Sequence, residues 1–93
     1  MRIMAVCGSG LGSSFMVQMN IEKVLKEMGI SGVEVEHSDV SSAVPGAADV
    51  FYLSKDIAEG LKIDAPTVVL DSIIDMDELR TKVEKTVDDF GLR

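Results

Sequence analysis

The sequence predicts an α/β fold in which a four-stranded parallel sheet, with strand order 2-1-3-4, is doubly wound by helices on both faces. Segments with strand patterns alternate with segments with helix patterns, which is typical of parallel sheets joined by crossover helices. Right-handed crossovers favour the stated strand order. The length of 93 residues suits one domain, 1–93, since a chain of this size hardly forms two separate cores.

The first part of the chain contains two strand patterns around one helix pattern. Residues 2–7 are a short apolar run that ends at a glycine cluster, which indicates a buried strand. Within 13–28, apolar side chains recur 4, 7, 8 and 11 residues after Val17, which is one helical stripe, and Gly29 provides the stop. Residues 33–37 alternate with period two, so we expect a half-buried or edge strand there.

The second part contains two further strands and two helices. Residues 41–48 include serine, proline and glycine and predict a loop, whereas 49–53 predict a third strand. Ser54 can cap a short helix that runs to about residue 61, and 67–70 form a fourth strand after a proline. The last helix begins where Asp75 and Glu78 resemble a capping box. Its apolar stripe consists of Met76, Leu79, Val83, Val87 and Phe90.

Composition excludes several classes of function. The net charge of −7 argues against a general nucleic-acid binder, which needs a basic face. A single cysteine excludes an internal disulfide and any zinc or redox motif built on cysteine pairs, so we expect no metal and no cofactor. No apolar run reaches the roughly 18 residues of a membrane-spanning helix, and no signal peptide is apparent. We therefore expect a cytoplasmic protein, in which a free thiol stays reduced.

The segment between the first strand and the first helix carries the chemistry. Ligands bind at the carboxyl ends of the strands in doubly wound sheets, beside the point where the strand order reverses. Glycines let backbone amides curl around an anion, and the N-terminus of the next helix favours the same anion. Cys7 lies at the start of this phosphatase-like loop. The loop consists of Gly8, Ser9, Gly10, Leu11, Gly12, Ser13 and Ser14.

This setting favours the thiolate of Cys7, which can attack phosphorus. Residues 1–21 contain no Asp or Glu, and the first acid is Glu22. A carboxylate beside a phosphorylated cysteine would repel it, so an acid-free segment suits a phosphate site. The alternative is a glycine-rich turn after a buried, inert cysteine.

Other phosphate-binding motifs fit less well. A dinucleotide fingerprint needs a glycine where Ser13 or Phe15 stands, and an ATP-binding loop needs a lysine that is absent between Arg2 and Lys23. A cysteine phosphatase has an arginine six positions after its nucleophile, and here that position is Ser13. Without this cation, hydrolysis of a thiophosphate should be slow, so the loop would store a phosphoryl group and pass it on.

Residues 3–14, and the helix up to Met19, resemble the IIB components of bacterial sugar phosphotransferase systems, most closely the ascorbate type within the lactose/cellobiose-like superfamily. The resemblance implies a phosphotransferase in which Cys7 accepts a phosphoryl group from a histidine of enzyme IIA, with 8–14 as its phosphate loop. Cys7 would donate the group to a sugar, L-ascorbate for this type, at the membrane permease, enzyme IIC. Together with the charge and the lack of a long apolar run, this leads us to expect no nucleic-acid partner and no direct membrane insertion.

Three alternatives stay open at this point. Galactitol-type IIB proteins, or those for other sugars, have a similar opening. A low-molecular-weight cysteine phosphatase shares the predicted fold, and a non-catalytic anion-sensing module would use the same loop. The lone histidine, His37, is interpreted as an ordinary residue near the end of a strand. Phe15 and Met16 lie beside the loop and form either an apolar docking surface or part of the core.

Overall fold

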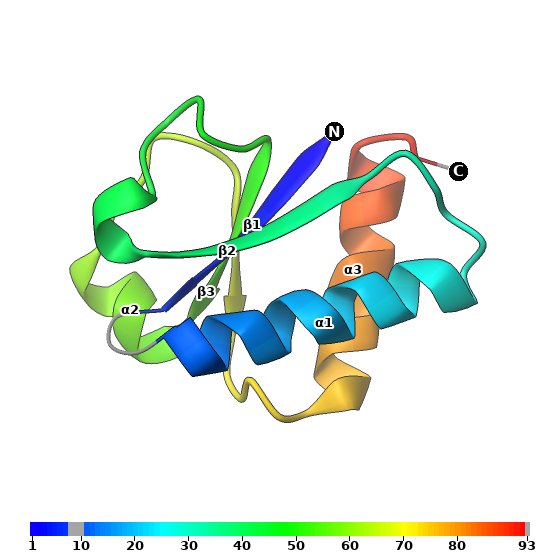
Figure 1. The fold of residues 1–93 in the computed structure, drawn as a ribbon, viewed down its shortest axis with the longest axis horizontal. Coiled ribbons are helices and arrows are strands. Elements are labelled where there is room, and N and C mark those ends of the chain that lie inside the picture. The colour runs from blue at the N-terminus through cyan, green and yellow to red at the C-terminus, as the bar shows by residue number, and fades with distance from the viewer. Residues whose placement is uncertain (8–10, 93) are drawn as a thin grey trace.

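The computed structural model describes residues 1–7 and 11–92, and for Cys7 and residues 11–14 it describes the backbone alone. Strands and helices alternate along the chain (Figure 1). In chain order the elements are β1 (Arg2–Cys7), α1 (Leu11–Glu27), β2 (Glu34–Asp39), the 3-10 helix η1 (Val40–Ser42), β3 (Val50–Ser54), α2 (Lys55–Gly60), β4 (Thr67–Leu70) and α3 (Met76–Asp89).

The four strands form one parallel sheet in the order β2-β1-β3-β4, which confirms the predicted topology. The central strand β1 pairs with both β2 and β3. Cys7, its last residue, pairs with Asp39 of β2, and Val6 pairs with Leu53 of β3. The carboxyl ends of β1, β2 and β3 therefore lie side by side at one edge of the sheet.

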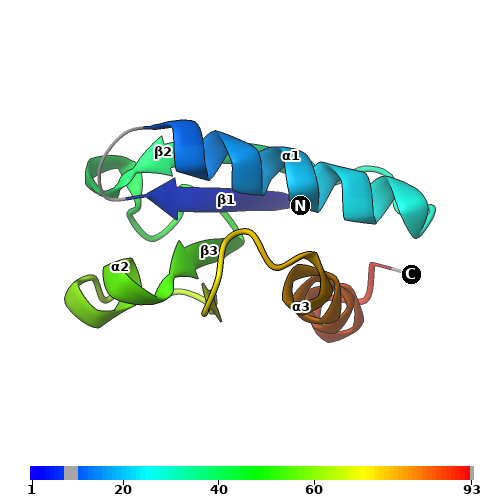
Figure 2. The same ribbon diagram turned by 90° about the horizontal axis from the view of Figure 1, so that it is seen from below.

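Helices cover both faces of this sheet, as predicted. α1 and α3 pack on the same face and contact each other, and Figure 2 shows how these two helices lie relative to the strands. Successive side chains of β1 point to opposite faces of the sheet. Ile3 and Ala5 pack in the core between the sheet and α1 and α3, whereas Met4 and Val6 pack in the core on the side of α2. The larger core also contains Val17, Ile21, Val24, Leu25, Val50, Tyr52, Leu70, Leu79, Val83 and Val87.

The end of α1 confirms the predicted stop at Gly29. This glycine has a φ of 73°, and its amide donates to the carbonyl of Lys26 at 3.1 Å. The next amide, that of Ile30, donates to the carbonyl of Leu25 at 2.9 Å. These two bonds form a Schellman motif, in which the left-handed residue is most often glycine.

Three expectations about local structure need correction. The predicted loop 41–48 begins inside η1, because Asp39 caps that turn by accepting the amide of Ser41 at 3.1 Å. Phe90 lies past the end of α3, where it is 38% exposed, and does not belong to the apolar stripe. Asp75 does cap α3, but Glu78 does not complete the capping box, since it accepts the amides of Asp71 and Ser72 instead.

None of the helices in the described part of the chain is long and apolar enough to cross a membrane.

Candidate functional site

The candidate site lies at the carboxyl end of β1, where the strand order reverses between β2 and β3. Cys7 is the last residue of β1, and α1 begins at Leu11, two residues earlier than the apolar stripe suggested. Gly12, Ser13 and Ser14 thus belong to the first turn of α1. The predicted loop residues Gly8, Ser9 and Gly10 lie outside the described residues.

The N-terminus of α1 differs from those of the other two α-helices. Its first turn contains no acidic residue, whereas α2 has Asp56 and α3 has Asp77 and Glu78 at that place. Unpaired amides at a helix N-terminus attract anions, and acidic side chains of the same helix compete for them. The first turn of α1 therefore contributes no carboxylate that would repel an anionic ligand.

The sheet register brings one acid next to the site that the sequence pattern did not reveal. Asp39 is the pairing partner of Cys7, although the first 21 residues of the chain are free of acids. Its carboxylate accepts the hydroxyl of Ser41 at 2.6 Å. This bond, followed by bonds from the backbone amides of η1, lowers the pKa of Asp39. The charge of Asp39 is thus engaged by the η1 turn.

A second serine–aspartate pair lies at the end of β3. Ser54 precedes α2 and makes no side-chain cap to that helix. Its hydroxyl instead bonds to Asp56, and this bond is the main cause of the lowered pKa of that carboxyl. A serine hydroxyl therefore binds an aspartate at the carboxyl end of each strand that neighbours β1: Asp39, the last residue of β2, and Asp56, two residues after β3.

His37 connects β2 to the beginning of α1. Its Nδ1 forms a hydrogen bond with Oε1 of Gln18, and its ring lies 5.3 Å from the ring of Phe15, centroid to centroid, at 59°. Gln18 in turn donates to Glu22 at 3.4 Å. The interpretation of His37 as an ordinary strand residue therefore missed a contact that joins two elements at the site.

The chain matches the model of the PTS system, Lactose/Cellobiose specific IIB subunit family over residues 2–85. It belongs to this family. A curated relative is the Ascorbate-specific PTS system EIIB component of Mycoplasma pneumoniae, with 26% identity over 83 residues, or 88% of this chain and 87% of that protein. The match confirms the resemblance inferred from residues 3–14, and it extends over most of the fold.

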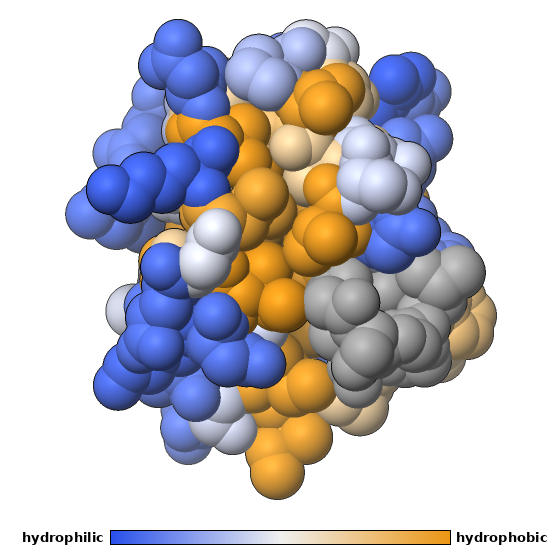
Figure 3. Space-filling view, turned by 90° about the vertical axis from the view of Figure 1, so that its left-hand side faces the viewer, coloured by the Kyte–Doolittle hydropathy of each residue, from blue (hydrophilic) through white to orange (hydrophobic). Residues whose placement is uncertain are grey.

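Large apolar side chains are exposed on several elements of this IIB subunit. Phe15 is 48% exposed and Met19, one helical turn later, is 53% exposed, whereas Met16 is half-buried. Of the two residues proposed from sequence, Phe15 is thus the surface residue. Figure 3 views the side on which β1 ends and shows a band of apolar surface there. Further exposed apolar residues are Val40 and Val44 after β2, Ile74 after β4 and Phe90 after α3.

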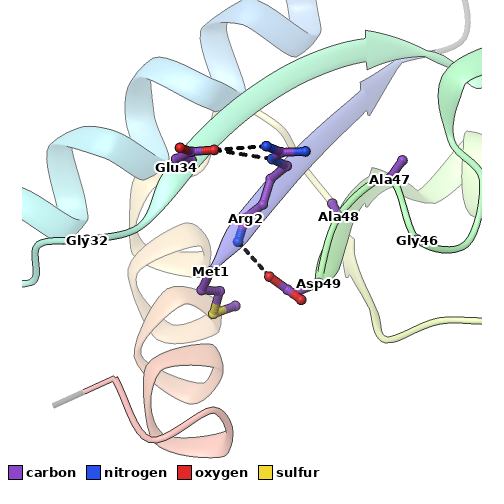
Figure 4. Close-up of a pocket in the computed structure, with 8 residues that line it drawn as sticks. All are labelled: Met1, Arg2, Gly32, Glu34, Gly46, Ala47, Ala48 and Asp49. Carbon is purple, nitrogen blue, oxygen red and sulfur yellow. Dashed lines mark hydrogen bonds and ion pairs between the residues drawn. The ribbon is translucent and has the colours of Figure 1, made fainter.

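A hollow of about 320 Å³ lies at the opposite end of β1 (Figure 4). There the guanidinium of Arg2 is 3.1 Å from the carboxylate of Glu34, and the amide of Arg2 donates to Asp49 at 2.7 Å. Because these charged groups pair with one another, the hollow does not offer a free cation to a phosphate. Within the described residues, no group of three or more potential ligands is placed to hold a metal ion.

Proposed function

We propose that this chain is a phosphocarrier, the IIB subunit of a sugar phosphotransferase system, with Cys7 as the catalytic residue and 1–93 as one IIB domain. The observation that carries the proposal is the position of Cys7 at the carboxyl end of a central strand, four positions before the start of a helix whose first turn has no acid. Family membership supports the same role.

The proposed cycle has two transfers. In the first, the thiolate of Cys7 attacks the phosphorus of a phosphohistidine on enzyme IIA. The S–P bond forms as the N–P bond breaks, and the released imidazole takes a proton from solvent. In the second, a hydroxyl oxygen of the sugar attacks the same phosphorus, the S–P bond breaks, the hydroxyl proton goes to solvent and the thiolate returns. Each transfer depends mainly on positioning and charge stabilisation, which we assign to the amides of Gly8 to Ser14.

We propose L-ascorbate as the sugar, on the basis of the ascorbate-specific relative. The alternative is a galactitol-type subunit or one for another sugar. Enzyme IIC is the proposed site of the second transfer, with the IIB chain on the cytoplasmic side. The exposed Phe15 and Met19 on α1, together with the apolar band in Figure 3, support docking of IIA and IIC at this end of the molecule, since exposed apolar patches commonly mark protein contacts.

The test is incubation of the chain with phosphoenolpyruvate, the general phosphotransferase proteins and an ascorbate-type IIA. We expect the intact mass to rise by one phosphoryl group, with the adduct on Cys7, and Cys7→Ser to remain unmodified. Absence of an adduct would leave the carrier role unsupported. Steady release of phosphate from an aryl phosphate, abolished by Cys7→Ser, would instead favour the phosphatase alternative.

The sugar is tested with the phosphorylated chain and membrane vesicles that contain IIC. Labelled L-ascorbate should be phosphorylated by vesicles with the ascorbate permease, and galactitol should not be phosphorylated by vesicles with the galactitol permease. The reverse result would assign the subunit to the galactitol type.

A further inference from the structure

We propose that His37 is a positioning residue of the phosphorylated state, and that protonation of its imidazole is linked to the charge on Cys7. The inference rests on the proposed function. It adds a proton-binding group to a site whose loop contains no cationic residue.

The first step is the distance between the two residues. His37 pairs with Ala5 of β1, and Asp39 pairs with Cys7. A two-residue offset along the strands, combined with the spacing between neighbouring strands, puts the Cα atoms of Cys7 and His37 about 8 Å apart. This backbone separation is close to the screening length of about 8 Å at physiological ionic strength, so we expect charges on the two side chains to interact.

The second step is the state of the imidazole. Nδ1 donates its proton to Oε1 of Gln18, and the ring contacts Phe15. In the neutral imidazole the other nitrogen, Nε2, then holds the lone pair and is the atom that gains or loses a proton. The ring therefore stays on α1 in both protonation states, and a change in pH changes its charge without releasing it from Gln18.

The third step is the charge around the ring. On α1, the nearest acid in the hydrogen-bond network is Glu22, which accepts from Gln18. On β2 itself, Glu36 lies 3.7 Å from the guanidinium of Arg2, and Asp39 is bonded to the hydroxyl of Ser41. The paired residue on β1 is the uncharged Ala5.

The variable charge is that on Cys7, where a phosphoryl group adds up to two negative charges. Because nearby negative charge favours the protonated imidazole, we expect phosphorylation of Cys7 to favour protonation of His37. Because this coupling is mutual, protonation of His37 also favours phosphorylation of Cys7. We expect the equilibrium constant for phosphorylation to be about threefold to tenfold larger at low pH than at high pH.

The chain has one histidine and one cysteine, so the coupling is measurable without ambiguity. In the first experiment, Cys7 is alkylated with iodoacetate, which adds a negative charge, or with iodoacetamide, which adds a neutral group of similar size. The imidazole of isotope-labelled His37 is then titrated by NMR in both samples. A higher midpoint in the carboxymethyl form supports the proposal, and equal midpoints overturn it even if the carrier function holds.

The second experiment repeats the titration on the labelled chain phosphorylated by unlabelled donor proteins, with intact mass recorded on the same sample. An adduct with an unchanged midpoint overturns the role of His37 alone, whereas the lack of any adduct overturns the carrier function and this inference with it. His37→Asn retains an N–H donor toward Gln18 but does not titrate. We expect this variant to be phosphorylated with a pH dependence that lacks the threefold to tenfold change.

Discussion

Glu78 accepts the backbone amide of Asp71 at 2.8 Å, so the first turn of α3 is tied to the residue that follows β4. Its second carboxylate oxygen accepts the amide of Ser72 at 3.0 Å. Lys82 lies 3.5 Å from the same carboxylate, and its ammonium group donates to the carbonyl of Val69. One half-buried acid therefore holds the connection between the last strand and the last helix.

We predict that Glu78→Gln lowers the free energy of unfolding by about 1–2 kcal/mol, because a side-chain amide offers one acceptor oxygen where the carboxylate offers two. Urea unfolding at pH 7 measures the loss. Glu84→Gln, an exposed position on the same helix, is the matched control and should leave the midpoint unchanged. Equal loss in both variants would mean that general helix charge, and not the bonds to Asp71 and Ser72, carries the effect.

The contribution of Glu78 should depend on pH in a defined direction. The amide of Asp71, then that of Ser72, lowers the pKa of Glu78 below its ordinary value of 4.5. A lowered native pKa contributes stability above the ordinary value and loses it as the pH falls through the native value. The difference between the wild type and Glu78→Gln should therefore be full at pH 6 to 7 and shrink below about pH 4.5. A constant difference down to pH 3 would contradict this origin.

Tyr52, the single tyrosine of the chain, is buried beneath α3, where its hydroxyl lies 2.6 Å from that of Thr86. Burial raises the pKa of Tyr52 to about 12 from an ordinary value of 10. Because the neutral form is favoured in the folded chain, stability should be lost as the pH rises from 10 toward 12. Ultraviolet absorbance of tyrosinate measures this ionisation directly. A midpoint near 10 in the folded protein would contradict the burial, and Tyr52→Phe provides the blank.

Local sequence patterns were sufficient to predict the helices, the strands and their order along the chain. Gly29 and the stripe after Val17 predicted where α1 ends, and the short run 67–70 predicted β4 with the bounds that the structure has. These features depend on neighbours in the sequence. Alternation of strands and helices then restricts the sheet to few topologies, which is why the strand order was also predictable.

Contacts between distant segments were not predictable in the same way. The pairing of Asp39 with Cys7 depends on the register of two strands that lie about 30 residues apart in the sequence. Glu78 bonds to the amide of Asp71 instead of completing the capping box because of where β4 ends in space. The contact of His37 with Gln18 depends on how α1 crosses β2. The roles assigned to Cys7 and to Gly8 through Ser14 stay predictions.

Substitution by alanine should destabilise the fold at Gly29 but not at Gly60. Gly29 has a φ of 73°, a left-handed conformation that disfavours a side chain, whereas Gly60 has no such strain, and an added methyl group meets no atom within 4 Å at either position. We predict that Gly29→Ala costs about 1 kcal/mol and that Gly60→Ala is neutral or slightly stabilising. Thermal unfolding of the two variants decides this, and equal losses would show that strain at Gly29 is not the cause.

Exposed apolar residues on α1 and after β4 should contribute to partner binding. Met19 is 53% exposed and Ile74 is 74% exposed, so a lysine at either position removes apolar contact area at little cost to folding. We predict that Met19→Lys and Ile74→Lys each raise the Kd for the phosphoryl donor IIA about tenfold, as truncation of a central interface residue does. Titration calorimetry with unphosphorylated IIA measures the change.

Phe90→Lys is the control for this surface, because Phe90 is also exposed but follows the far end of α3, at the amino edge of the sheet. We expect it to bind IIA like the wild type, with circular dichroism used to verify that all three variants are folded. If Phe90→Lys weakens binding as much as Met19→Lys, the loss comes from added positive charge and not from a localised contact. If only Phe90→Lys weakens binding, the donor docks at the opposite edge, and the proposed approach to Cys7 is wrong.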